Sequence, residues 1–105
     1  MLESGGKLKM SKSILQNKKE CYICGLYYLV EEHHIYFGAN RKISEQQGFK
    51  VWLCVEHHRG TIGVHGKYGH ALDIRLKQEC ERKYINLGHT KEEFIKLIGK
   101  NYLDN

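Results

Sequence analysis

Two pairs of residues, each with two residues between its members, constrain the fold of this chain more than any other feature. The first pair is Cys21 and Cys24, and the second is Cys54 and His57, with 29 residues between the two pairs. Cysteine sulfur and histidine nitrogen are ligands of Zn²⁺, and structural zinc sites are closed tetrahedra of four such ligands. The spacing therefore predicts two knuckle turns that together hold a structural Zn²⁺ ion.

The size of the chain gives such a metal site a structural purpose. A chain of 105 residues supports one compact domain, and a domain of this length buries only about two-thirds of its unfolded surface. A closed zinc site stabilises a small core and positions the segments next to it. The alternative is that Cys21 and Cys24 are reduced thiols and that Cys54 is a core residue. Cys80 is another candidate for the fourth ligand, but it lies on an apolar helical stripe and is expected to be a core residue.

The hydropathy pattern gives no sign of a membrane segment. No apolar run approaches the roughly 20 residues of a membrane span, and the N-terminus lacks the apolar stretch of a signal peptide. We therefore expect a cytoplasmic protein without membrane contact, a setting in which a closely spaced cysteine pair indicates metal binding rather than a disulfide.

Positive charge is concentrated near the N-terminus. The formal net charge of the chain is +5, and residues 1–20 contain five Lys against two Glu. This segment is predicted to be a flexible basic arm, which either attracts polyanions or is only a solvated tail. The stretch before Met10 is also open to interpretation as vector-derived sequence, so it carries no weight in the fold prediction.

The first two-thirds of the chain has the local pattern of a small β-rich core. Residues 26–30 and 33–37 are rich in β-branched and aromatic side chains and predict a strand or a bent hairpin, and residues 49–53 alternate as a second strand. Between these strands, Ser44 and a glutamine three residues later have the spacing that caps a short helical turn. Four glycines between residues 60 and 69 predict a flexible segment.

The C-terminal third is helical by its period. Five residues lie on one apolar stripe with helical spacing: Leu72, Leu76, Cys80, Tyr84 and Leu87. Gly88 ends this predicted helix, and Thr90 with Glu93 forms a capping box that opens a second helix, which Gly99 ends. The sequence thus predicts an α+β fold in which a small metal-stapled β core is followed by two helices.

A second group of candidate ligands adjoins the predicted zinc site. Six of the seven histidines lie between residues 33 and 70; His33 and His34 are consecutive on a predicted strand, and His58 directly follows His57. Consecutive strand residues point to opposite faces, so His33 and His34 are expected to have different roles. An imidazole has a pKa suited to removing a proton from water near neutral pH, and a divalent cation neutralises a phosphate and its leaving oxygen. These residue types favour phosphodiester hydrolysis.

The run H-H-I at residues 33–35, followed by a loop and then C-x2-H-H at residues 54–58, resembles the HNH (ββα-metal, His-Me finger) endonucleases of phages and bacteria that carry a zinc knuckle. The resemblance covers about residues 21–65. It implies an α+β fold with a small zinc-stapled ββα-metal core followed by two C-terminal helices. On this basis residues 21–105 form one nuclease domain, in which residues 71–99 are a helical extension.

The resemblance also implies roles for individual residues. His34 corresponds to the general base, and His33 and His58 correspond to ligands of a catalytic divalent ion, which is Mg²⁺, Mn²⁺, Ni²⁺ or Zn²⁺. His65 is the best match for a further ligand of some members, although it follows His58 by seven residues across glycines. The asparagine usual in the family before the second knuckle is missing. Asn40, the only asparagine between His34 and the second knuckle, is the candidate replacement for holding the base in register.

The resemblance implies a metal-dependent DNA endonuclease or nickase that hydrolyses phosphodiester bonds. Five cations near the histidines are candidates for contacts with DNA phosphates: Arg41, Lys42, Lys50, Arg59 and Lys67. The alternative is a non-enzymatic zinc-knuckle module that binds DNA or protein, as an inactive relative of these nucleases would. A third possibility is one metal site that shares ligands between the two groups. The expected compartment is the cytoplasm of a bacterial or phage-infected cell, and a homodimer that cuts both strands stays open.

Overall fold

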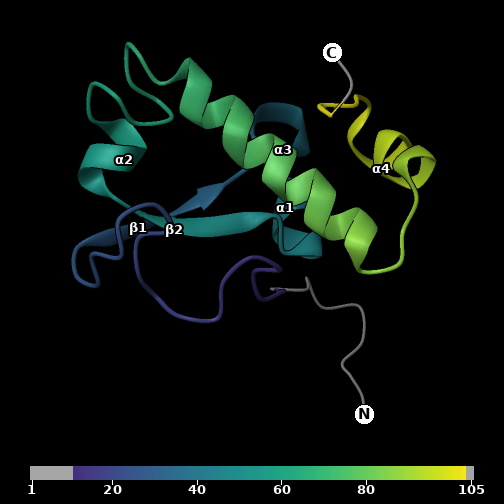
Figure 1. The fold of residues 1–105 in the computed structure, drawn as a ribbon, viewed down its shortest axis with the longest axis horizontal. Coiled ribbons are helices and arrows are strands. Elements are labelled where there is room, and N and C mark those ends of the chain that lie inside the picture. Colours follow the sequence, from purple (N-terminus) through teal and green to yellow (C-terminus); the bar gives the residue numbers. More distant parts are fainter. Residues whose placement is uncertain (1–10, 104–105) are drawn as a thin grey trace.

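The fold is built on one small antiparallel sheet whose two faces have different surroundings. The computed structural model describes residues 11–103, and this part of the chain is α+β, with a two-stranded sheet and four α-helices. The elements are β1 (Val30–His34), the short 3-10 helix η1 (Gly38–Asn40), α1 (Arg41–Gln47), β2 (Lys50–Cys54), α2 (Val55–Arg59), α3 (His70–Asn86) and α4 (Lys91–Ile98). In Figure 1, α3 crosses on one side of the sheet, and the chain leading into the sheet passes on the other. No helix in the described part is both long enough and apolar enough to cross a membrane.

The register of the sheet assigns alternate residues to its two faces. Three pairs of residues lie directly opposite one another: Glu32 with Trp52, His33 with Val51, and His34 with Lys50. Residues directly opposite in an antiparallel sheet share a face. Val51 is buried in the core, so His33 lies on the core-facing side, whereas Glu32 and His34 lie on the other face.

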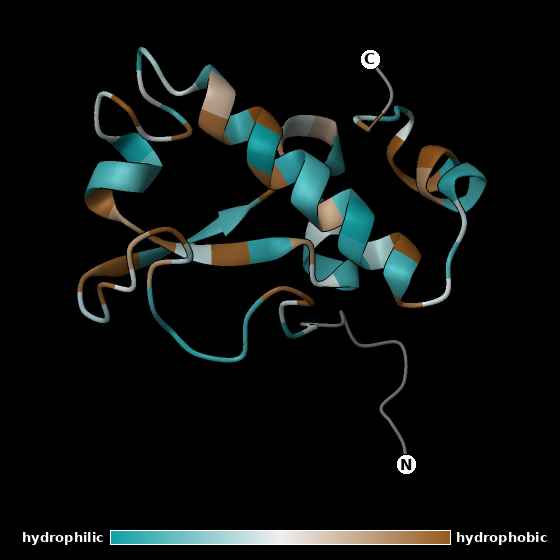
Figure 2. Cartoon of the chain, in the orientation of Figure 1, coloured by the Kyte–Doolittle hydropathy of each residue, from teal (hydrophilic) through white to brown (hydrophobic). Residues whose placement is uncertain are grey.

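The core lies between the sheet and the C-terminal helices. Leu76 and Cys80 of α3, Phe94 of α4 and Leu53 of β2 are fully buried in one cluster, and a buried side chain such as Leu or Phe contributes about 1.5–3 kcal/mol. Figure 2 shows hydrophobic residues in β2 and hydrophilic residues over much of the visible side of α3. The prediction that Cys80 is a core residue is confirmed.

The capping box predicted for the last helix is present. The Thr90 side chain accepts a hydrogen bond from the Glu93 backbone N–H at 3.0 Å, and the Glu93 carboxylate accepts one from the Thr90 N–H at 2.7 Å. Replacing Thr90 by alanine is expected to lower the free energy of unfolding by about 1 kcal/mol, because it leaves a helix N–H without its cap. Urea denaturation measures this difference. Thr61→Ala, at an exposed threonine outside any helix, is the control, and an equal loss in both variants would contradict the capping role.

The chain before β1 does not form the strand that its β-branched and aromatic residues predicted. The strand starts only at Val30, because Leu29 has a left-handed φ of 53°, which interrupts an extended chain. The Cys21 backbone N–H donates to the Leu26 carbonyl at 2.7 Å and folds this stretch back on the first knuckle. The strand also ends at His34, so the predicted strand of residues 33–37 is only partly present.

The spacing of Ser44 predicted that it caps a helical turn, and this prediction is wrong. α1 begins three residues earlier, at Arg41, and Ser44 is buried inside it. The Ser44 hydroxyl donates to the Tyr36 carbonyl at 2.7 Å and accepts from the Tyr36 N–H at 3.2 Å. A contact with the chain after β1 thus takes the place of the local cap, and it fixes α1 against the end of that strand.

Residues 11–20, the described half of the predicted basic arm, hydrogen-bond to the chain in and beside β2. The Ile14 N–H donates to the Gly48 carbonyl at 3.0 Å, and the Gln16 side-chain oxygen accepts from the Trp52 N–H at 2.7 Å. The outer edge of β2 offers unpaired backbone groups, and this segment covers them. The first ten residues of the predicted arm lie outside the described residues.

Candidate metal centres and a histidine pocket

The four residues of the predicted zinc knuckle lie together. One ligand atom from each of Cys21, Cys24, Cys54 and His57 falls within 4.8 Å of the others. The Sγ atoms of Cys24 and Cys54 are 3.8 Å apart, and His57 Nδ1 lies 3.3 Å from Cys54 Sγ. A zinc–sulfur bond of about 2.3 Å corresponds to sulfur–sulfur edges of roughly 3.8 Å in a tetrahedron. The cluster therefore has the dimensions of a structural metal site.

The chemistry of the sulfur atoms also fits a metal ion. The cysteines of the cluster are free thiols. Burial raises the pKa of Cys21, but hydrogen bonds from the backbone of Cys54, Cys24 and Ile23 bring that pKa down to about 6. Burial raises the pKa of Cys54. Thiolates this close repel one another, and a cation bound among them would offset that repulsion.

Local backbone geometry explains why these ligands converge. Gly25 has a φ of 81° and its N–H donates to the Cys21 carbonyl at 2.8 Å, which closes the first knuckle as predicted. Cys54 ends β2 and is also the N-cap of α2. His57 comes three residues later, about one helical turn, so its ring returns to the same side as the Cys54 sulfur.

A second cluster consists of three histidines from three different segments. His33 of β1, His58 of α2 and His65 of the following loop place one ring nitrogen each within 4.8 Å of the others. His33 is only 2% exposed, and its Nε2 is buried without a hydrogen-bond partner in the described part of the chain. Burial, together with the charges of His58 and His65, lowers the pKa of His33 to about 3, so this ring is neutral. An unpaired buried nitrogen costs about 1–3 kcal/mol, and neutral imidazoles suit divalent transition metals, so the cluster fits such an ion.

Glu31 orients one of these histidines. Its Oε1 atom accepts a hydrogen bond from His58 Nδ1 at 2.7 Å, and the same carboxylate accepts from the Arg59 guanidinium at 2.8–3.2 Å. These hydrogen bonds, first from Arg59 and then from His58, lower the pKa of Glu31 to about 2. A carboxylate on one ring nitrogen of a histidine fixes the other nitrogen for a metal. No motif in the sequence pointed to Glu31, although its position two residues before His33, on the same strand face, was a usable signal.

Replacing Glu31 by glutamine is expected to weaken binding of Mn²⁺ or Ni²⁺ to the three-histidine cluster by about 10- to 100-fold, because His58 loses its anionic partner. Isothermal titration of the zinc-loaded protein measures the dissociation constant. Glu56→Gln on α2, at an exposed glutamate, changes the same charge without touching His58 and serves as the control. Equal affinities in the two variants would show that Glu31 does not support a metal ligand.

The glycine-rich segment after α2 is a series of hydrogen-bonded turns, not the flexible segment that its composition predicted. The Gly63 N–H donates to the Gly60 carbonyl at 2.9 Å, and the Gly66 N–H donates to the Gly63 carbonyl at 2.8 Å. A Cβ atom on Gly66 would lie 1.8 Å from the Gly60 oxygen, so no larger residue fits this close packing. The same turns let the His65 N–H donate to the His58 carbonyl at 2.8 Å, which brings the third histidine to the cluster.

His34 makes its contacts on the opposite face of β1. Its Nε2 lies 2.6 Å from Glu45 Oε1, and Glu45 Oε2 accepts from Lys50 Nζ at 2.8 Å. Hydrogen bonds from Lys50 and His34 lower the pKa of Glu45, which keeps this carboxylate anionic. Glu45 belongs to α1, and nothing in the sequence pattern indicated it, because the contact depends on how α1 packs against β1.

A surface hollow of about 210 Å³, here named the histidine pocket, joins the two faces. Its lining consists of Glu32, His33, His34, Phe37, Arg41, His58 and His65. Consecutive residues of β1 point to opposite faces, so a hollow lined by both His33 and His34 reaches around the outer edge of this strand. The three candidate metal ligands and the candidate base therefore border one space.

The five candidate phosphate contacts differ in how free they are. Arg41, Lys42 and Lys67 are exposed, and Arg41 lines the histidine pocket. Lys50 is buried and forms ion pairs with two carboxylates. The Arg59 guanidinium forms an ion pair with the Glu31 carboxylate. Arg41 is thus the cation of this group with the clearest access to a phosphate in the pocket.

The Asn40 side chain hydrogen-bonds away from His34. Its Nδ2 atom donates to the Ile98 carbonyl at 2.9 Å, which joins the start of α1 to the end of α4. Among the described residues, the side chain that hydrogen-bonds to His34 is Glu45. The structure thus gives Asn40 a role in holding two helices together and gives the position beside the candidate base to a carboxylate.

The two clusters are separate sites. Among residues 11–103 the cysteine-containing cluster and the three-histidine cluster have no ligand in common, which argues against one metal site that shares ligands. The first has four candidate ligands and the second has three and a pocket. Comparison of the chain with models of known protein families, with curated proteins and with solved structures gave no match.

Proposed function

We propose that this protein is a metal-dependent DNA endonuclease or nickase of the HNH type, which hydrolyses phosphodiester bonds. The observation that carries the proposal is the histidine pocket, in which three histidines able to hold one ion share a space with a fourth histidine on the opposite strand face. A site with three protein ligands leaves coordination positions for substrate and water, whereas a site with four is closed. The two clusters therefore divide into a catalytic and a structural centre.

The donor sets indicate what each centre holds. Cys21, Cys24, Cys54 and His57 are proposed to bind structural Zn²⁺. The three-histidine cluster is proposed to bind a catalytic divalent ion, which when present neutralises charge on the scissile phosphate and on the leaving oxygen. The unpaired Nε2 of His33 and the Glu31 carboxylate on His58 support this assignment.

His34 is proposed to be the general base. With its Nε2–H donated to the Glu45 carboxylate, the Nδ1 atom of the ring is the basic nitrogen. It accepts the proton of the attacking water, and the positive charge that develops on the ring is stabilised by Glu45. Lys50 holds Glu45 in place through its own hydrogen bond. Arg41 is the proposed contact for a phosphate oxygen at the mouth of the pocket.

A non-enzymatic binding module is the second candidate, and one observation favours it. Tyr27, Tyr28 and Leu29, next to the first knuckle, are 77%, 56% and 75% exposed, as a docking loop of a zinc-knuckle module would be. Such a module requires the cysteine-containing cluster, but it does not require that three histidines converge in the histidine pocket. The pocket therefore makes the nuclease the better supported function.

A plasmid assay distinguishes the two candidates. Zinc-loaded protein is incubated with supercoiled plasmid and Mg²⁺, Mn²⁺ or Ni²⁺ in parallel reactions, and the conversion to open-circular and linear DNA is followed on a gel. The nuclease is expected to nick the plasmid with at least one of these ions and to stop when excess EDTA is present. Absence of nicking with every ion, in protein shown to be folded and to contain zinc, would contradict the nuclease and favour the binding module.

A further inference from the structure

A second hollow, here named the Trp52 groove, lies on the sheet face that points away from the core. Its volume is about 440 Å³, within the roughly 300–1,000 Å³ typical of sites for small organic ligands. Residues 11–13 and 16–19 form one side, and Glu32 with residues 50–52 of the sheet forms the other. Glu32 lies directly opposite Trp52 in the register and also lines the histidine pocket. The groove and the proposed catalytic pocket therefore adjoin at Glu32.

Trp52 is the single tryptophan of the chain, and it is fixed in position by its backbone. Its N–H donates to the Gln16 side-chain oxygen at 2.7 Å, and its carbonyl accepts from the Tyr22 N–H at 2.8 Å. Trp52 is only partly buried, so part of its apolar ring is accessible to solvent. Lys19 Nζ lies 4.7 Å from the ring centroid. The groove thus presents an aromatic surface next to a cation.

The charge of the groove is suited to an anion. Lys12, Lys18 and Lys19 line it and are exposed, and none of the three forms an ion pair with a described residue. Lys50 is different, because its charge is offset by Glu32 and by a second carboxylate. Three uncompensated lysines beside one aromatic ring are the combination that single-stranded nucleic acid sites use, with stacking for a base and cations for the phosphates.

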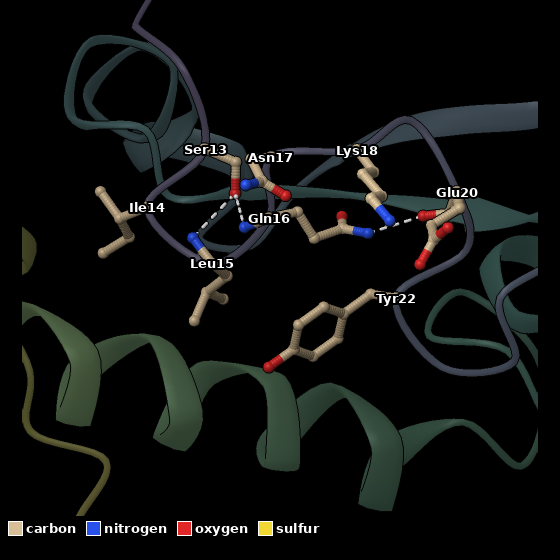
Figure 3. A pocket seen from close by; sticks show the side chains of 8 residues that line it. All are labelled: Ser13, Ile14, Leu15, Gln16, Asn17, Lys18, Glu20 and Tyr22. Carbon is tan, nitrogen blue, oxygen red and sulfur yellow. Dashed lines mark hydrogen bonds between the residues drawn. The ribbon is translucent and has the colours of Figure 1, made fainter.

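The segment that carries these lysines has an ordered backbone. As Figure 3 shows, the Ser13 hydroxyl accepts hydrogen bonds from the backbone N–H groups of Leu15 and Gln16, and the Gln16 amide donates to the Glu20 carbonyl. The hollow drawn there, of about 480 Å³, lies on the side of the segment toward α3 and has Lys18 as its one cation among its described lining residues. The Trp52 groove is therefore the side of this segment that combines several cations with an aromatic face.

We propose that the Trp52 groove binds an unpaired nucleotide of the DNA strand whose scissile phosphate lies in the histidine pocket. The base stacks on Trp52, where it replaces the flexible Lys19 side chain, and the neighbouring phosphates contact Lys12, Lys18 and Lys19. A base reaches the face of an indole only when it leaves its own duplex stack. The proposal rests on the proposed nuclease function and narrows its substrate to DNA with a single-stranded stretch beside the cleavage site.

Fluorescence of the single tryptophan tests the groove directly. The zinc-loaded protein is titrated, without any other added divalent ion, with a 12-nucleotide oligo(dT), with a blunt 12-base-pair duplex and with heparin. Oligo(dT) is expected to quench the emission of Trp52 strongly at low salt, whereas the duplex and heparin, which offer charge but no unpaired base, quench it weakly. Lack of quenching by oligo(dT), or equal quenching by all three, would overturn the proposal.

Two variants separate stacking from charge. Trp52→Ala is expected to weaken binding of fluorescein-labelled oligo(dT), measured by anisotropy, by about 5- to 150-fold, because one stacked base contributes about 1–3 kcal/mol. Lys18→Ala is expected to reduce the slope of log affinity against log salt concentration by about 0.7, since one phosphate contact is lost. Tyr68→Ala removes another exposed aromatic ring, outside the groove, and is the matched control, which is expected to bind like the unaltered protein. If Trp52→Ala does not fold, Trp52→Phe, which keeps a smaller ring, is expected to bind with intermediate affinity, and loss no greater than in the Tyr68 variant would overturn the stacking role.

The binding test and the plasmid test fail in different ways. Nicking of plasmid without quenching of Trp52 would overturn the groove proposal and leave the nuclease in place. Quenching by oligo(dT) without nicking by any ion would overturn the nuclease, and with it the placement of the scissile phosphate. When both results are positive, a duplex with a single-stranded flank is expected to be cut faster than a blunt duplex, and the Trp52 variant is expected to lose that preference.

Discussion

Replacing His34 by alanine is expected to lower the rate of metal-dependent DNA nicking by about 100- to 10,000-fold, the usual contribution of a general base. The variant loses the nitrogen that accepts the proton of the attacking water. It keeps His33, His58 and His65, so its affinity for the divalent ion is expected to stay unchanged. The measurement is the single-turnover rate of plasmid nicking at saturating ion concentration, with the dissociation constant of Mn²⁺ determined separately.

Two controls make this result specific to the base. His89→Ala removes a histidine that follows the C-terminal end of α3 and stacks on Tyr84, with ring centroids 4.0 Å apart. Nicking by this variant is expected to be unchanged. Glu45→Gln keeps the hydrogen-bonding shape beside His34 but loses its charge, so a smaller loss of rate without a change in metal affinity is expected. Nicking by His34→Ala at the rate of the unaltered protein would show that another group, or the metal alone, activates the water.

Removal of the structural metal is expected to unfold the protein. Binding of Zn²⁺ to a Cys/His cluster is associated with about 10–16 kcal/mol, which is comparable with the whole stability of a small domain, about 5–15 kcal/mol. Excess of a strong chelator is therefore expected to abolish the cooperative thermal transition seen by circular dichroism, and Cys24→Ser is expected to give the same result with no chelator. Cys24 is exposed, so its substitution removes a ligand with little loss of packing.

Zinc content provides the check on this second prediction. The unaltered protein is expected to retain one tightly held zinc per chain after dialysis, measured by a colorimetric zinc assay on denatured protein, and Cys24→Ser is expected to retain none. Cys80→Ala loses a buried sulfur in the core but no ligand, so it is expected to melt at a lower temperature while keeping its zinc. Loss of zinc from the Cys80 variant, or an unchanged melting curve in the presence of chelator, would contradict the structural role of the cluster.

The parts of the site that sequence predicted are those set by short-range spacing. The knuckle at Cys21 and Cys24 needs one tight turn, and Gly25 supplies its left-handed conformation. The pair of Cys54 and His57 is one helical turn, and the capping box at Thr90 lies within a single turn as well. Such features depend on a few neighbouring residues, so the pattern of the chain is sufficient to find them.

The parts that sequence did not predict depend on contacts between distant segments. Glu45 reaches His34 only because α1 packs on β1, and the burial of Ser44 has the same origin. Residues 11–20 lie along the edge of β2, a contact that the lysine content of the segment does not indicate. Glycine-rich composition suggested mobility for residues 60–69, whereas the glycines permit a close packing of backbone that places His65. In each case a tertiary contact overrides the local preference.

Helix α2 links the two clusters energetically, because His57 and His58 are neighbours on it. A helix of five residues has no stability of its own, so its position comes from its ends, and the cysteine-containing cluster holds the first of them. Loading of that cluster is therefore expected to fix α2 and to reduce the conformational entropy that is lost when the proposed second ion binds to the three histidines. Thermodynamic linkage makes such an effect reciprocal: the two proposed ions are expected to bind with positive cooperativity, and removal of zinc is expected to abolish the second site together with the fold.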